Sequence, residues 1–124
     1  MRKMNIIILM AFMIMMLNPM MSKACTEIDM GEFRLTAYCP CETCSSHWGR
    51  QTATGVTARS GHTIAVDPKV IAYGTIIAIG NREYIAEDCG ARVKGDHIDI
   101  FVDTHEEVEQ FGVKYKNVWI TGRR

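Results

Sequence analysis

The stretch "GTIIAIGNREYIAEDCGARVKGDHIDIF", residues 74–101, contains three apolar runs separated by turn residues. The first two runs, 74–80 and 82–88, are rich in residues that favour β-strands, and Gly80-Asn81 between them is typical of a hairpin turn. The third run, "HIDIFV" at 97–102, has the same character. This stretch therefore predicts a β-hairpin followed by a further strand.

Strand patterns also flank this stretch on both sides. Apolar and polar residues alternate in "FRLTAY" at 33–38, which indicates a strand with one buried face. "HTIAVD" at 62–67 predicts another strand, stopped by Pro68 because proline has no N–H for a ladder. "KYKNVWI" at 114–120 predicts the last strand, whereas 39–55 has no period and is expected to be a loop.

One short helix is predicted, in "THEEVEQFG" at 104–112. Thr104 is a suitable N-cap, Glu107 lies three positions later as in a capping box, and Gly112 is a typical C-terminal residue. Six short strands and one short helix predict an all-β protein, a small six-stranded β-barrel. Without repeats or a linker, residues 25–124 are expected to form a single domain.

The first 24 residues have the features of a secretory signal peptide. Arg2 and Lys3 precede an uncharged apolar run, and small residues stand before Cys25. A membrane anchor is the alternative, but the run from Asn5 covers only about 13 residues of the roughly 20 that span a bilayer. We therefore expect a secreted or cell-envelope protein without stable membrane association after cleavage.

The charge of the chain excludes one class of partner. The full sequence is neutral, with 14 basic and 14 acidic residues, and removal of Arg2, Lys3 and Lys23 leaves 11 basic residues and a formal charge of −3. Nucleic-acid binding requires a basic face that displaces counterions, so no nucleic-acid partner is expected. No cofactor motif is present, and no cofactor is expected.

Three aspartates, Asp67, Asp88 and Asp99, lie at or within predicted strands. If Ile98 and Ile100 point into the core, alternation puts Asp99 on the other face, which on a barrel can be the floor of a groove. A carboxyl that is partly desolvated beside other carboxylates has a raised pKa and can donate a proton near neutral pH. The alternative is that these aspartates are turn formers and surface charges.

The order of several motifs resembles the 3D domain, named for three aspartates and found in secreted cell-wall lytic enzymes. The motifs are "TATG" (52–55), "GHTIAVDP" (61–68), "YGT" (73–75), "AEDCGARVKGDHIDIF" (86–101) and "HEEVEQFG" (105–112). The resemblance implies a double-psi β-barrel similar to the catalytic domain of membrane-bound lytic transglycosylase A and to muralytic proteins of spore-formers. It also implies that Asp67, Asp88 and Asp99 are the three aspartates of the name.

The resemblance further implies cleavage of peptidoglycan glycan strands at the β-1,4 bond between N-acetylmuramic acid and N-acetylglucosamine, leaving 1,6-anhydro ends. Asp99 is then the catalytic acid and base, and Asp88 and Asp67 raise its pKa and orient it. Thr52, Thr54 and the backbone near Gly90 are expected to bind sugar hydroxyls or developing charge. The alternative function is a non-catalytic, expansin-like polysaccharide-binding module.

One motif departs from the family pattern. A threonine and two glycines usually follow the second aspartate, whereas this chain has Cys89, Gly90 and Ala91. The hydroxyl is lost at Cys89, and Ala91 replaces a glycine whose position can require positive φ. This departure favours the binding-module alternative.

The cysteines allow two interpretations. Cys39, Cys41 and Cys44 with His47 offer four ligands for zinc, although within one short segment rather than as two separated pairs. In an exported protein disulfides are the rule, so we expect a disulfide from one of these cysteines to Cys89, and no metal. With five cysteines at least one thiol stays unpaired in the monomer, and Cys25 is the expected one.

Overall fold

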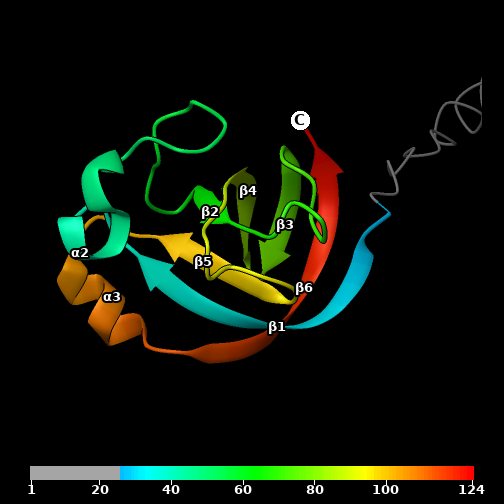
Figure 1. Cartoon of the computed structure of the whole chain (residues 1–124). Coiled ribbons are helices and arrows are strands. Elements are labelled where there is room, and N and C mark those ends of the chain that lie inside the picture. Colours follow the sequence, from blue (N-terminus) through cyan, green and yellow to red (C-terminus); the bar gives the residue numbers. More distant parts are fainter. Residues whose placement is uncertain (1–25) are drawn as a thin grey trace, which may run out of the picture.

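A computed structural model describes residues 26–124 (Figure 1). The predicted signal peptide, residues 1–24, lies outside this described part, as does Cys25. Between residues 26 and 124, no helix is both long enough and apolar enough to cross a membrane.

Six strands close into a barrel in the order β1-β5-β2-β4-β3-β6. The all-β, six-stranded barrel predicted from the sequence is thereby confirmed. The strands are β1 (Ile28–Tyr38), β2 (Thr63–Ala65), β3 (Thr75–Ile79), β4 (Arg82–Asp88), β5 (His97–Phe101) and β6 (Lys114–Arg123).

Strands that are distant in the sequence lie next to each other in the barrel. β1 pairs in parallel with β5, and β2 pairs in parallel with β4, whereas β6 runs antiparallel to both β1 and β3. The predicted hairpin joins β3 and β4 through Gly80, whose φ of +61° favours glycine. These pairings bring Tyr38 at the end of β1, Asp88 at the end of β4 and Asp99 within β5 to the site described below.

The alternation seen in the sequence corresponds to the buried face of each strand. In β3, Thr75, Ile77 and Ile79 are buried, whereas Ile76 and Ala78 are only half-buried. The same period holds in β1, where Phe33 and Leu35 point inward. The core cluster consists of Phe33, Leu35, Ile64, Val66, Ile71, Ile77, Ile79, Ala86, Ile98, Ile100 and Val118.

The predicted helix is α3 (His105–Phe111), and it lies outside the barrel next to α2 (Figure 1). Thr104 Oγ1 accepts a hydrogen bond from the Glu107 N–H at 3.2 Å, as predicted for the cap. The Glu107 carboxylate contacts the Thr104 hydroxyl at 3.3 Å instead of the backbone N–H that a full capping box uses. Gly112 follows the last helical residue, as expected.

The segment 39–55, expected to be a loop, contains two short helical pieces. They are α2 (Glu42–Ser45) and the 3₁₀ helix η1 (Ser46–Trp48). Neither buries a side chain, so neither has the apolar period by which a helix is recognised in a sequence.

Candidate functional site

A cavity of about 760 Å³ is lined by residues of β1, β2, β4 and β5. This volume is in the range of sites that hold small molecules or short ligand segments, roughly 300–1,000 Å³. Segments 42–53 and 88–94 form its walls together with the strand ends. Its lining includes Tyr38, Trp48, Thr52, Asp88, Gly90 and Asp99.

Two of the three aspartates are brought together by the register of four neighbouring strands. Thr36 of β1 pairs with Asp99 of β5, Asp99 pairs with Ala65 of β2, and Ala65 pairs with Asp88 of β4. Paired residues on adjacent strands point to the same face of a sheet. Asp99 and Asp88 therefore both line the cavity, and the small side chain of Ala65 leaves space between them.

Asp99 lies on the face of β5 that the alternation predicted. Its neighbours Ile98 and Ile100 are in the core, whereas its own carboxyl faces the cavity. Burial raises the pKa of Asp99 above its ordinary value, and the nearby charge of Asp88 raises it further, against the lowering effects of Thr36 and His97. This is the direction required for a carboxyl that donates a proton.

A hydrogen-bonded chain leads from Asp99 to His97. The Thr36 hydroxyl donates to Asp99 Oδ1 at 2.9 Å and also lies 2.8 Å from His97 Nε2. His97 Nδ1 lies 3.2 Å from the carbonyl oxygen of Arg92, which as a pure acceptor requires a proton on Nδ1. The Thr36 hydroxyl thus connects the Asp99 carboxyl to the His97 ring.

Asp88 is held in place by three donors. The Tyr38 hydroxyl donates to Oδ2 at 2.8 Å, and the backbone N–H groups of Ala53 and Cys89 each donate to Oδ1 at 2.9 Å. Burial raises the pKa of Tyr38 well above its ordinary value, so this hydroxyl remains a neutral donor. Asp88 thus fixes the 52–56 turn against β4 and adds negative charge beside Asp99.

Asp67 does not have the position expected for a residue that orients Asp99. It is absent from the cavity lining, and its two oxygens accept hydrogen bonds from the N–H groups of Lys69 and Gly95, both at 3.0 Å. These hydrogen bonds lower the pKa of Asp67. Its contacts hold the turn after β2 to the loop before β5, a structural role that purely local turn propensity would not reveal.

The predicted sugar-binding residues divide in the same way. The Thr52 and Thr54 hydroxyls donate to the carbonyl oxygens of Val56 and Glu87, both at 2.7 Å. Thr52 lines the cavity and Thr54 does not, whereas Gly90 and Ala91 both line it. Ala91 does not have positive φ, so this departure from the family pattern causes no backbone strain.

Several cavity features were not predicted. Thr36, Ala65 and Lys94 lie next to the site or line it. Strand pairing or a loop brings each of them there, and neither leaves a local signal in the sequence.

The two aromatic residues near the cavity differ in role. Trp48 is 56% exposed and lines the cavity, whereas Tyr38 packs edge-on against Phe101 and donates its hydroxyl to Asp88.

Residues 62–122, which include β2 to β5, most of β6 and two of the cavity carboxylates, match the family model described as the 3D domain. These residues form a 3D domain. The resemblance inferred from the motifs is thereby confirmed. Two relatives from Bacillus subtilis (strain 168) are each 38% identical to the chain: "Cell wall-binding protein YocH" over 71 residues and "Putative cell wall shaping protein YabE" over 84 residues.

These matches are partial on the side of the relatives. They include 54% and 64% of this chain but only 25% of YocH and 20% of YabE.

Among solved structures, the chain is similar to MltA from Escherichia coli, which is described as having a unique lytic transglycosylase fold. The TM-score is 0.51 and the identity 24%, over 60% of this chain and 28% of MltA. MltA with bound chitohexaose gives a TM-score of 0.51 at 23% identity, over 59% and 27% of the two chains. At this identity the likeness establishes the fold of the 3D domain alone.

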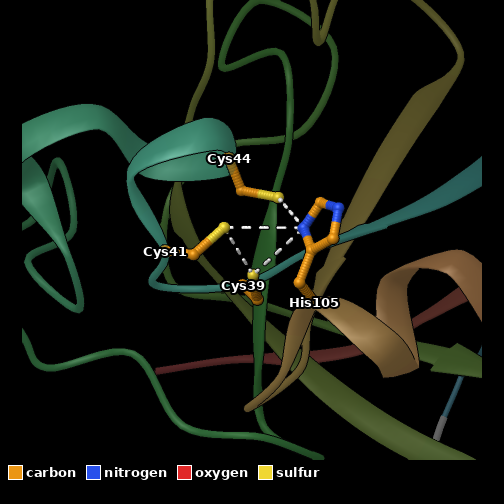
Figure 2. Close-up of side chains that lie close together, drawn as sticks. All are labelled: Cys39, Cys41, Cys44 and His105. Atoms are coloured by element: carbon orange, nitrogen blue, oxygen red, sulfur yellow. Dashed lines mark hydrogen bonds between the residues drawn. The ribbon is translucent and has the colours of Figure 1, made fainter.

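A second cluster lies beside the 3D domain cavity, at the ends of β1 and α3 (Figure 2). Its members are Cys39, Cys41, Cys44 and His105, whose Sγ and ring-nitrogen atoms all lie within 4.8 Å of one another. Burial raises the pKa of Cys39 to about 12, and the hydrogen bond from Cys39 lowers the pKa of Cys41 to about 6.

The structure differs from both interpretations of the cysteines, in the fourth zinc ligand and in the disulfide. His47, the expected fourth zinc ligand, instead lies against the Trp48 ring, 4.5 Å between centroids, and His105 takes its place beside the thiols. In residues 26–124 all the cysteines are free thiols, so the disulfide to Cys89 is not formed there. Cys89 lies next to Tyr73 and raises the pKa of that hydroxyl to about 12.

Proposed function

We propose that this protein cleaves peptidoglycan glycan strands as a lytic transglycosylase outside the cytoplasm, with Asp99 as its acid and base. The observation that carries the proposal is a half-buried carboxyl with a raised pKa, facing a cavity large enough for sugar rings and paired through Ala65 with a second carboxylate. The 3D domain match, the lytic transglycosylase fold of MltA and the wall-related names of the relatives support the same chemistry.

The reaction needs one residue that acts twice. Protonated Asp99 donates its proton to the glycosidic oxygen while the bond from that oxygen to C1 of the muramic acid breaks. Ionised Asp99 then removes the proton from the C6 hydroxyl of the same sugar, whose oxygen attacks C1 and forms the 1,6-anhydro ring. Because the nucleophile belongs to the substrate, no second carboxylate is needed to activate water or to form a covalent intermediate.

The surroundings of Asp99 match these two steps. Asp88, held by its three donors, supplies negative charge that favours the protonated starting form of Asp99 and stabilises positive charge at C1 in the transition state. The Thr36 hydroxyl, shared by Asp99 and His97, stabilises the ionised form between the two steps. Trp48, exposed at the cavity wall, offers a ring face for sugar stacking.

The direct test is digestion of purified peptidoglycan by the purified chain. Soluble products are separated and identified by mass spectrometry, which distinguishes 1,6-anhydro ends from the reducing ends left by hydrolysis. The proposal expects anhydro products that increase with time and enzyme concentration. Reducing ends alone, or no soluble product, would contradict it.

A polysaccharide-binding module is the second candidate, because YocH is named as a cell wall-binding protein and the "CGA" stretch lines the cavity. Co-sedimentation with insoluble peptidoglycan separates the two candidates in the same samples. Saturable binding without any anhydro product would assign the cavity to binding.

Substitution Thr36→Val is expected to shift the pH profile. Valine has the same shape but cannot donate to Asp99 Oδ1, so the ionised form loses a stabilising hydrogen bond and the pKa of Asp99 rises further. Asp99 then stays protonated to higher pH. The alkaline limb of the plot of kcat/KM against pH therefore moves to higher pH. The readout is the rate of anhydro-product release across a pH series.

Thr75→Val is the control, since Thr75 is also a strand threonine, is buried and donates to the Ala72 carbonyl at 2.6 Å, away from the cavity. It should reduce stability without moving the pH profile. An alkaline limb that stays in place or moves to lower pH in Thr36→Val would remove Thr36 from this role.

A further inference from the structure

We propose that Cys39, Cys41, Cys44 and His105 bind one zinc-class divalent ion that fixes a wall of the cavity. The three thiols and the imidazole come from three parts of the chain. Cys39 follows β1, Cys41 precedes α2 and Cys44 lies within it, and His105 begins α3 (Figure 2). None of the four is one of the cavity carboxylates, so the proposal stands apart from the glycan chemistry.

The three sulfur-to-nitrogen distances match the edges of a tetrahedral site. Bonds of about 2.3 Å to sulfur and about 2.0–2.1 Å to nitrogen place sulfur and nitrogen ligands about 3.6 Å apart at a tetrahedral ion. The three sulfur distances to His105 Nδ1 are 3.8 Å for Cys39, 3.5 Å for Cys41 and 3.4 Å for Cys44. The sulfurs of Cys39 and Cys41 are 3.1 Å apart, longer than the roughly 2.05 Å of a disulfide bond and shorter than the roughly 3.8 Å sulfur–sulfur edge of a tetrahedral site, so these two sulfurs would move apart when the ion binds.

Hydrogen bonding alone does not account for this convergence. A single ring nitrogen has either one proton or one lone pair, whereas three sulfurs are directed at Nδ1 of His105 (Figure 2). The opposite nitrogen, Nε2, lies 3.6 Å from Glu109 Oε1, one turn later in α3. A proton on Nε2, the nitrogen that faces this carboxylate, leaves the Nδ1 lone pair free for a metal.

The donor set selects the kind of ion. Three thiolates and one imidazole form a soft set that suits zinc, whereas magnesium and calcium prefer oxygen. Four protein ligands complete a tetrahedral shell, so no position remains for water, and the site is structural rather than catalytic. Binding releases the thiol protons to solvent and involves no oxidation or reduction.

An ion at this point would give α2 and η1 the anchor that they otherwise lack. Neither element buries a side chain, and a helix of four residues has little stability of its own. Yet Glu42, Cys44 and Trp48 from these elements line the cavity. Metal binding would connect them to the end of β1 and the start of α3, and so hold that wall in place.

The test begins with the unaltered chain, reduced and then incubated with zinc or cobalt(II). We expect one ion per chain by native mass spectrometry, and thiolate-to-cobalt charge transfer with intense tetrahedral d–d bands. Iodoacetamide should modify exposed Cys89 freely, while half-buried Cys41 and Cys44 are protected only when the ion is present; buried Cys39 is protected in either case. Absence of the cobalt bands, or equal modification of Cys41, Cys44 and Cys89 with zinc, would overturn the proposal.

Two histidine variants complete the test. His105→Ala should weaken zinc binding by more than the roughly 10–100-fold that loss of an outer-shell partner costs. His47→Ala is the matched control, because His47 lies near in sequence but contacts Trp48, and it should bind zinc as the parent does. Equal affinity in both variants would overturn the assignment of His105. A disulfide among Cys39, Cys41 and Cys44 in protein purified with zinc and without reductant would overturn the site itself, whether or not a variant folds.

Discussion

Substitution Asp99→Asn is expected to abolish release of 1,6-anhydro products from peptidoglycan, with a rate loss of at least about 100-fold. Asparagine has the size and hydrogen-bonding shape of the protonated acid but can neither donate an acidic proton nor take one back. The cavity, the hydrogen bond partner Thr36 and the neighbouring Asp88 remain. Product release per unit time, measured by mass spectrometry, gives the effect, and co-sedimentation with peptidoglycan should be retained.

The matched control is Asp96→Asn, three positions earlier in the same segment, where the residue is exposed. It removes the same charge without touching the cavity lining, so the rate should stay close to that of the parent. Full activity in Asp99→Asn, or an equal loss in Asp96→Asn, would take the acid and base role away from Asp99.

The same Asp99→Asn substitution should also raise thermal stability at neutral pH. A carboxyl whose pKa is raised by folding is harder to ionise in the folded state, so its ionisation disfavours folding. This loss in the free energy of unfolding is absent below the ordinary aspartate pKa of about 3.9. It grows as the pH rises above that value and is complete above the raised pKa of the folded state. The difference in Tm between variant and parent should therefore grow from acid to neutral pH, and a parent that is more stable at neutral pH would contradict the burial argument.

Phe33→Ala is expected to lower the free energy of unfolding by about 3–5 kcal/mol. Phe33 is 1% exposed and belongs to the core cluster, so truncation removes a large apolar contact area and leaves a cavity that the surrounding strands only partly close. Small domains have a total stability of about 5–15 kcal/mol, so the variant would lie near the edge of folding. Denaturant titration followed by circular dichroism measures the change.

Ile28→Ala is the matched control, because Ile28 is an apolar residue of the same strand but is 53% exposed. Its effect should stay within about 0.5 kcal/mol, as for other surface substitutions. If the two variants lost similar stability, the assignment of Phe33 to the core would be wrong.

Local patterns in the sequence predicted much of this protein, because strand alternation, hairpin turns and helix caps depend on neighbours within a few residues. The β3–β4 hairpin, the Thr104 cap and the orientation of Asp99 opposite Ile98 and Ile100 are of this kind. The short α2 escaped prediction because it buries no side chain and so has no apolar period. The 3D domain itself was recognisable because its motifs stand in a fixed order along the chain.

Only the tertiary structure decided which of the candidate groups meet. Thr36 reaches Asp99 across 63 positions, and His105 reaches Cys44 across 61, through parallel pairing and the docking of α3. Because of the same packing, Asp67 does not line the cavity and His47 is not a member of the thiol cluster. The physical reason is that residue spacing constrains only the local backbone, whereas contacts between distant residues depend on how the closed barrel buries the apolar faces of all its strands together.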